Sequence, residues 1–264
     1  MAIEIFNRYE NKYLINEKTF SRICCRLSDY MELDAHNKQR GTYSIANIYY
    51  DTEDSHLIRT SLSKPKYKEK LRLRSYGVPG SDSKVYVEIK KKVNKLVNKR
   101  RSALKPDEAY AFLHDGIIPA PQSYMNEQVL REIVSILESN TVKPALCISY
   151  DRLAYFGIGR HDLRVSFDTN IQTRRYDLRL ESGAYGEQLI DADSLIMEIK
   201  VAQSIPVWLC RLLSENKVYP VSFSKYGTEY KRMLKRGRER RIFFIPEIMP
   251  FPAQAKTFAA AIAQ

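Results

Sequence analysis

The segment Lys66-Tyr67-Lys68-Glu69-Lys70-Leu71-Arg72-Leu73-Arg74-Ser75-Tyr76 alternates cationic side chains with mostly apolar ones. A period of two is the pattern of a β-strand, because successive side chains point to opposite faces of the sheet. Every even-numbered position from 66 to 74 is Lys or Arg, whereas Tyr67, Leu71 and Leu73 lie on the other face. The segment therefore predicts a strand with one fully cationic face.

Five further predicted strands place charged or polar side chains on one face in the same way. These faces carry Lys84, Tyr86, Glu88, Lys90 and Lys92; Arg8, Glu10 and Lys12; Tyr150 and Arg152; Arg164, Ser166 and Asp168; and Ile196, Glu198 and Lys200. Any single strand of this kind fits a half-exposed antiparallel sheet. Six strands with a mostly cationic bias instead favour a closed sheet whose charged faces converge inside. Such an interior needs an anion of high charge density to offset the repulsion between its cations, and a phosphate chain is such an anion.

The remaining pattern completes an α+β protein whose strands follow one another mostly in hairpin order. Strands are predicted over 3–15, 43–51, 66–76, 84–93, 95–104, 145–156, 162–168, 171–178 and 194–201, and helices over 17–33, 106–114, 124–139, 206–216 and 225–238. This order favours an antiparallel barrel or strongly curved sheet with helices packed outside. No linker or repeat marks a boundary, so we predict one domain over 1–241 and a C-terminal tail over 242–264.

The basic composition indicates an anionic partner but does not identify the class of anion. The net charge is +12 and the isoelectric point is near 9.4, so nucleic acid, an anionic membrane, and polyphosphate or nucleotide are all open. The first residues have no apolar signal region, and no apolar run reaches the ~18 residues that span a bilayer. Four sparse cysteines fit neither a disulfide framework nor a zinc knuckle. We expect a cytoplasmic protein.

Aromatic side chains on the cationic faces would distinguish a nucleic-acid groove from a phosphate site, because bases stack on them. On these faces we find mainly Tyr86 and Tyr150, while Tyr67 lies opposite. The pattern therefore favours phosphates without many bases, and specific nucleic-acid binding is not expected.

Carboxylates share the same predicted faces. Glu88 is predicted to be a solvated carboxylate paired with lysine, the common situation for such a residue. Glu198 differs, because it lies within the apolar run Leu195–Ile199, where an unpaired carboxylate is costly. A divalent ion held by one or two carboxylates and substrate oxygens is the usual arrangement for phosphoryl transfer.

Nine short segments follow one another in a characteristic order over residues 4 to about 230. They are Arg8-Tyr9-Glu10-Asn11-Lys12-Tyr13, Ile48-Tyr49-Tyr50-Asp51-Thr52, Lys70-Leu71-Arg72-Leu73-Arg74, Val87-Glu88-Ile89-Lys90, Lys99-Arg100-Arg101, Ser149-Tyr150-Asp151-Arg152, Leu163-Arg164-Val165-Ser166-Phe167-Asp168, Met197-Glu198-Ile199-Lys200 and Ser222-Phe223-Ser224-Lys225-Tyr226. Together they resemble the VTC domain, the polyphosphate polymerase branch of the triphosphate tunnel metalloenzyme (CYTH-like) superfamily. No single segment is diagnostic, but the ordered set is specific.

The resemblance implies an eight-stranded antiparallel β tunnel, a closed barrel with helices outside. It further implies transfer of the γ-phosphate of ATP onto a growing polyphosphate chain, with manganese or magnesium. The implied catalytic residues are Lys12, Arg72, Arg74, Lys90, Arg152 and Arg164; the substrate-binding residues are Lys70, Lys99, Tyr150, Lys200, Ser224 and Lys225; and the metal ligands are Glu198 and Glu10. The implied partners are ATP and inorganic polyphosphate, while a membrane-associated partner and the oligomeric state stay open.

One position departs from the hydrolytic branch of that superfamily, whose members begin with Glu-x-Glu-x-Lys. Here Arg8 stands at the first place of Arg8-x-Glu10-x-Lys12. A cation there weakens a second metal site and the activation of water. A polymerase does not need that water, since its nucleophile is a phosphate oxygen that is already anionic. We therefore favour polymerisation, with an inorganic tri- or polyphosphatase or a non-catalytic polyphosphate or nucleic-acid binder as the alternatives.

Overall fold

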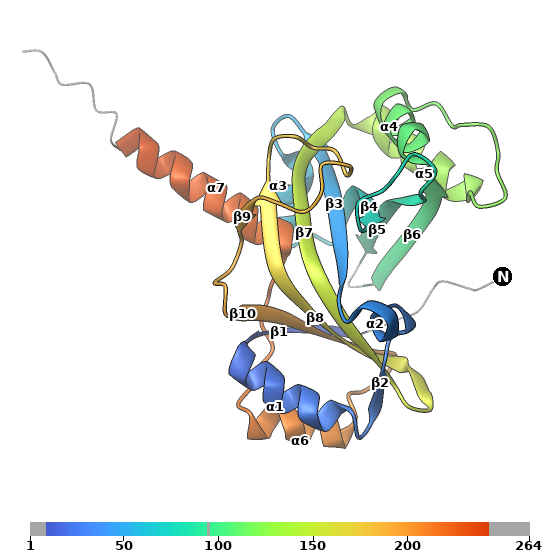
Figure 1. Ribbon diagram of the computed structural model, residues 1–264. Helices are drawn as coiled ribbons and strands as arrows, with labels where there is room; N and C mark the ends of the chain where they lie inside the picture. The colour runs from blue at the N-terminus through green and yellow to red at the C-terminus, as the bar shows by residue number, and fades with distance from the viewer. Residues whose placement is uncertain (1–8, 94–95, 243–264) are drawn as a thin grey trace, which may run out of the picture. The chain divides into compact units, whose positions relative to one another are not determined.

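The alternating segments form one large antiparallel sheet in the computed structural model, which describes residues 9–93 and 96–242 (Figure 1). The strands are β1 (Tyr9–Asn16), β2 (Met31–Leu33), β3 (Tyr43–Thr52), β4 (Tyr67–Tyr76), β5 (Val85–Val93), β6 (Leu96–Leu104), β7 (Val142–Gly157), β8 (Arg160–Arg174), β9 (Glu187–Gln188) and β10 (Ser194–Val201). Their order is β1-β10-β8-β7-β3-β4-β5-β6, with β2 paired to β7 and β9 paired to β8. In Figure 1, β1 and β10 run across the lower end of the long, bent strands β7 and β8.

Seven helices are described, and four of them cover the apolar face of the sheet. They are α1 (Glu17–Leu27), α2 (Ala35–Arg40), α3 (His56–Leu62), α4 (Pro106–Asp115), α5 (Glu127–Ser139), α6 (Val207–Glu215) and α7 (Lys225–Ile242). One hydrophobic core lies between α4, α5 and strands β3, β4 and β5, and a second lies between α1, α6 and strands β1, β8 and β10. The predicted arrangement, with helices packed on the apolar outside, is confirmed.

The strand register confirms that the charged faces coincide, because residues paired across neighbouring strands point to the same side. Lys12 lies opposite Glu198, which in turn lies opposite Ser166. On the other half of the sheet, Lys90 lies between Lys70 and Lys99. The cationic side of one predicted strand therefore continues across the sheet.

The α+β class is confirmed, but the prediction of a closed eight-stranded barrel is wrong for the described residues. The sheet has ten strands, and its ends, β1 and β6, are not joined by a ladder. An ion pair links the two halves instead, since Lys90 Nζ on β5 lies 3.7 Å from Glu10 Oε2 on β1. Side-chain alternation determines which face a residue occupies, but it carries no information about which edges share backbone hydrogen bonds.

Several boundaries differ from the predicted ones. The helix expected over 17–33 ends at Leu27, and the chain then turns so that β2 pairs with the end of β7. The two strands expected over 162–168 and 171–178 are one strand, β8. The short helices α2 and α3 were not predicted, because short amphipathic turns give little periodic signal.

The chain divides into two compact units, residues 1–230 and residues 231–264. The boundary predicted at residue 241 stays a prediction. Most of the predicted tail, residues 243–264, lies outside the described residues, as do residues 1–8 at the start of the first predicted strand.

Candidate anion-binding site

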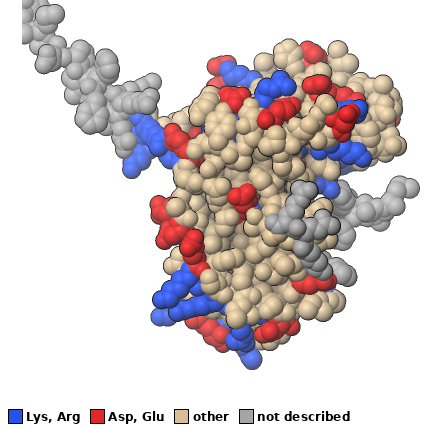
Figure 2. All heavy atoms as spheres, viewed as in Figure 1, with Lys and Arg blue, Asp and Glu red and all other residues tan. Residues whose placement is uncertain are grey.

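One face of the sheet gathers ten cationic side chains and four carboxylates into a set that we call the cationic cluster. It contains Lys12, Lys70, Arg72, Arg74, Lys90, Lys99, Arg152, Arg164, Lys200 and Lys225 together with Glu10, Glu88, Asp168 and Glu198. On the outer surface seen in Figure 2, by contrast, Lys and Arg are scattered among Asp and Glu. Ten cations less four carboxylates leave the cluster with a formal charge of +6, half of the net +12 of the chain.

Glu88 on β5 is the anionic centre of one part of the cluster. Arg72 Nε donates to Glu88 Oε2 at 2.7 Å, and Lys99 Nζ lies 2.9 Å from Glu88 Oε1. Arg74 Nε lies 3.7 Å away, and the Glu88 side chain is 1% exposed. Burial opposes ionisation, but the three cations hold the pKa of Glu88 far below its usual range. The prediction of a solvated Glu88 is therefore wrong, because the cations that pair with it also cover it.

Asp168 on β8 plays the same part beside β7. It accepts two hydrogen bonds from Arg152, Nε to Oδ1 at 2.7 Å and Nη2 to Oδ2 at 2.9 Å, and a third from Lys225 Nζ. The ring of Tyr150 lies 5.3 Å from the Arg152 guanidinium and 4.3 Å from the Lys225 ammonium. Although Asp168 is fully buried, Arg152 and Lys225 lower its pKa to about 2. The ionised carboxylate of Asp168 therefore holds the Arg152 and Lys225 side chains in place.

Glu10 and Glu198 form the third part, between β1 and β10. Glu10 lies 3.3 Å from Lys12, 3.7 Å from Lys90 and 4.0 Å from Lys200. Glu198 pairs with Lys200 and lies 3.8 Å from Lys12. Burial opposes ionisation, yet these lysines hold the pKa of Glu198 well below its usual range.

The remaining predicted residues join the same cluster. Lys70 Nζ donates to Ser224 Oγ at 3.4 Å, which brings the start of α7 against β4. Arg164 donates to Asp34 Oδ2 and to the Tyr43 hydroxyl, each at 3.2 Å. All fourteen residues assigned from the sequence are therefore brought together, although their individual roles stay predictions. Arg8 lies outside the described residues.

Three groups of the site were not assigned from the sequence. Glu88 and Asp168 are its anionic centres, and Tyr49 accepts a hydrogen bond from Arg72 Nη1 at 3.2 Å. Burial raises the pKa of Tyr49, but Arg72 and Lys70 outweigh it and lower that pKa to about 8. For Glu88 a signal was present, because it lies between Val87 and Ile89, as Glu198 lies between apolar neighbours.

The donor set at Glu10 and Glu198 fits a hard divalent ion that is completed by substrate. Burial and repulsion from Glu198 both oppose ionisation of Glu10, but Lys90, Lys200 and Lys12 outweigh them and lower its pKa, so both carboxylates are available as anionic ligands. Among the described residues, no group of three or more His, Cys, Asp or Glu side chains gathers to hold a metal. Two carboxylates plus phosphate oxygens are what Mg²⁺ commonly takes, so the residues present fit an ion that arrives with its substrate.

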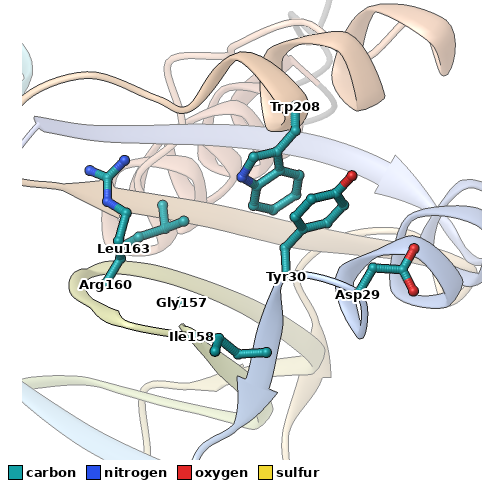
Figure 3. Close-up of a pocket in the computed structure, with 7 residues that line it drawn as sticks. All are labelled: Asp29, Tyr30, Gly157, Ile158, Arg160, Leu163 and Trp208. Atoms are coloured by element: carbon teal, nitrogen blue, oxygen red, sulfur yellow. The ribbon is translucent and has the colours of Figure 1, made fainter.

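A separate cavity of about 270 Å³ lies near α1 and α6 (Figure 3). It is lined by Asp29, Tyr30, Gly157, Ile158, Arg160, Leu163 and Trp208. The rings of Tyr30 and Trp208 stack there with centroids 4.2 Å apart. This lining shares no residue with the cationic cluster.

The sequence of this chain matches a known protein family. The sequence model of the VTC domain matches residues 7–234. The chain belongs to the VTC domain family. A curated protein similar to this VTC domain is vacuolar transporter chaperone complex subunit 4 of Schizosaccharomyces pombe, 25% identical over 264 residues. The match covers 84% of this chain but 36% of that protein, so the chain spans about a third of its length.

Two solved structures are also similar to this VTC domain. One, described as a candidate adenylate cyclase from Bacillus halodurans, has a TM-score of 0.48 and 18% identity over 81% of this chain and 92% of its own. The other, a Hippeastrum protein described as a candidate adenylyl cyclase with a dominant triphosphatase activity, has a TM-score of 0.47 and 15% identity over 82% and 92%. Family membership rests on the sequence match and not on these structures. None of the described helices has both the length and the apolar composition to cross a membrane.

Proposed function

We propose that this VTC domain is an ATP-dependent polyphosphate polymerase that transfers the γ-phosphate of ATP onto a growing inorganic polyphosphate chain. The observation that supports this most is the cationic cluster, in which ten Lys and Arg side chains face four carboxylates. A triphosphate and the end of a phosphate chain together supply the missing negative charge. A cytoplasmic location belongs to the same proposal.

In the proposed reaction, a terminal oxygen of the polyphosphate chain attacks the γ-phosphorus of ATP. The bond from that phosphorus to the β,γ-bridging oxygen breaks, and its electron pair leaves with ADP. Arg72, Arg74 and Arg152 suit bidentate contact with phosphate oxygens, while lysines add compact charge. Because Glu88 and Asp168 hold these arginines in place before substrate binds, alignment costs little at the moment of reaction.

Glu10 and Glu198 are the residues that would hold a divalent ion. When bound, such an ion neutralises developing charge on the transferred phosphoryl group. Lys12 and Lys200 already contact these carboxylates, so they would share them with the ion.

Hydrolysis on the same fold is the second candidate, and the ionisation of the buried carboxylates disfavours one route to it, the activation of water by a carboxylate base. A general base for water works best when its pKa lies near the working pH. Burial opposes ionisation, but neighbouring cations bring the pKa of Asp168 to about 2 and hold that of Glu198 well below its usual range. Such carboxylates are weak bases, whereas a phosphate nucleophile needs none.

The test is incubation of the purified chain with γ-labelled ATP and either Mn²⁺ or Mg²⁺. We expect label in a long polymer that an exopolyphosphatase degrades, with one ADP released for each phosphate added. Release of free phosphate without polymer would instead establish a phosphatase, and ATP binding without metal-dependent turnover would establish a binder.

Paired variants connect the activity to the cluster. Glu198→Gln should reduce polymer formation by about 100-fold or more, because it removes a charge that the ion and two lysines share. Glu215→Gln, an exposed position on α6, is the matched control and should keep full activity.

A further inference from the structure

Three tyrosines form what we call the aromatic rim at one end of the cationic cluster. The ring of Tyr76 lies 6.1 Å from that of Tyr43 and 5.8 Å from that of Tyr86. Tyr76 ends β4 and its residue is 46% exposed. The rim therefore offers an accessible aromatic surface with two further rings beside it.

The rim lies on the same side of the sheet as the cations. Tyr76 is two residues from Arg74 along β4, and Tyr86 is paired with Arg74 across the ladder. Tyr43 is paired with Arg152. Two residues of strand span about 7 Å, which is the scale that separates a purine from the first phosphate of its nucleotide.

Cations also border the rim. The Arg101 guanidinium lies 4.7 Å from the centre of the Tyr86 ring, and Arg164 donates to the Tyr43 hydroxyl at 3.2 Å. The opposite end of β4 differs, because Lys68 is paired there with Lys92, and Tyr67 points to the other face. One end of the cluster thus combines rings with cations, and the other end presents lysines.

We propose that the aromatic rim binds the nucleobase of the donor nucleotide by stacking, with Tyr76 as its platform, so that the triphosphate enters the cluster at Arg74. This deepens the proposed function, because it rests on a nucleotide being the phosphate donor. The sequence pattern showed mainly Tyr86 and Tyr150 on the cationic faces, and the structure adds Tyr43 and Tyr76 at one end.

The test compares ATP with inorganic triphosphate, which has the same phosphates and no base. Binding of each to the full chain is measured by calorimetry. Tyr76→Ala should weaken ATP binding about 10-fold and leave inorganic triphosphate binding unchanged, whereas Tyr76→Phe should keep both affinities. Tyr67→Ala is the matched control, since Tyr67 lies on the same strand, is 48% exposed and faces away from the cluster.

Equal loss of both ligands in Tyr76→Ala, or loss of neither, would overturn the inference. So would preferential binding of a single-stranded oligonucleotide over ATP at Tyr76, which would indicate a nucleic-acid surface. Selective loss of ATP binding in a chain that makes no polymer would retain the inference and reject only polymerisation. Thermal melting of each variant checks that the fold is intact.

Discussion

Lys70 and Lys99 carry ammonium groups that lose protons close to neutral pH. Burial lowers the pKa of Lys70 to about 8, and repulsion from Lys90 and Lys12 adds to it. Partial removal from water lowers the pKa of Lys99 to about 7, although Glu88 partly offsets this. Both lysines must be charged to bind phosphate. Metal-free affinity for inorganic triphosphate should therefore fall as pH rises from 7 to 9, which calorimetry across that range measures.

Arginine substitutions provide the control for this pH dependence. Lys70→Arg and Lys99→Arg keep their charge throughout the range, so the pH profile of triphosphate binding should be shallower in the double variant. Burial raises the pKa of Tyr49, but Arg72 and Lys70 outweigh it and lower that pKa to about 8, so Tyr49 contributes the slope that is left. Triphosphate gains its last negative charge within the same range, because repulsion between its two terminal phosphates delays the second of their ionisations, and this opposes the loss of affinity. Comparing the two proteins removes this contribution, since both bind the same ligand. An unchanged slope in the double variant would show that other groups titrate.

At the residue scale, the sequence predicted which side chains share a face but not how deeply they lie. The positions of Arg72 and Lys90 follow from period two within single strands. The burial of Glu88 and Asp168 does not, because it depends on cations from other strands and, for Asp168, on Lys225 far along the chain. A buried carboxylate is stable only with such partners, which no local pattern reveals.

At the scale of elements, Asp51 ties together three segments that support the site. This fully buried residue near the end of β3 accepts from the backbone amides of Leu57 at 2.8 Å and Ile58 at 3.0 Å, at the start of α3. It also accepts from the Tyr226 hydroxyl at 2.7 Å, which fixes the first turn of α7. That turn follows Ser224 and begins with Lys225, so the tie positions two residues of the cluster.

Asp51→Ala should lower the free energy of unfolding by about 3 kcal/mol, because it leaves buried donors without an acceptor. Urea denaturation measures this, and triphosphate affinity should fall with it as the start of α7 shifts. Tyr226→Phe removes one donor and should cost about 1 kcal/mol. Asp54→Ala, at an exposed position in the same turn, is the control and should change stability little. Equal losses in the free energy of unfolding for Asp51→Ala and Asp54→Ala would show that the hydrogen bonds of Asp51 do not stabilise this region.

The same contacts explain which elements could be predicted. Long alternating strands such as β4, β5 and β10 agree with their predicted limits to within a residue. The helix α3 is short, and its first backbone amides donate to Asp51, a residue of β3. The same carboxylate also accepts from the Tyr226 hydroxyl of α7. The formation of α3 therefore depends on contacts with residues distant in the sequence, and the local hydrophobic period does not predict it.

At the scale of the whole molecule, the cationic cluster makes the free protein less stable than the occupied one. Burial lowers the pKa of Lys90, and repulsion from Lys12 and Lys200 adds to this despite the Glu10 pair. A lysine whose pKa is lowered by folding opposes folding in its charged form. At 100 times its Kd, triphosphate should add about 2.7 kcal/mol and raise the Tm by about 5–10 °C. Sodium chloride at equal ionic strength should raise it less.

Lys90→Met separates the two effects, because it removes the charge and keeps most of the side-chain volume. The free variant should melt at a higher temperature than the unchanged protein, since burial of the ammonium disfavours folding by more than its 3.7 Å ion pair with Glu10 favours it. Its affinity for triphosphate should fall about 10-fold, since one charged donor to phosphate is lost. Lys91→Met is the matched control, because Lys91 is the next residue on β5 and lies 4.0 Å from Glu132 on the opposite face. A variant at position 90 that melts lower and binds as before would mean that this lysine serves the fold and not the anion.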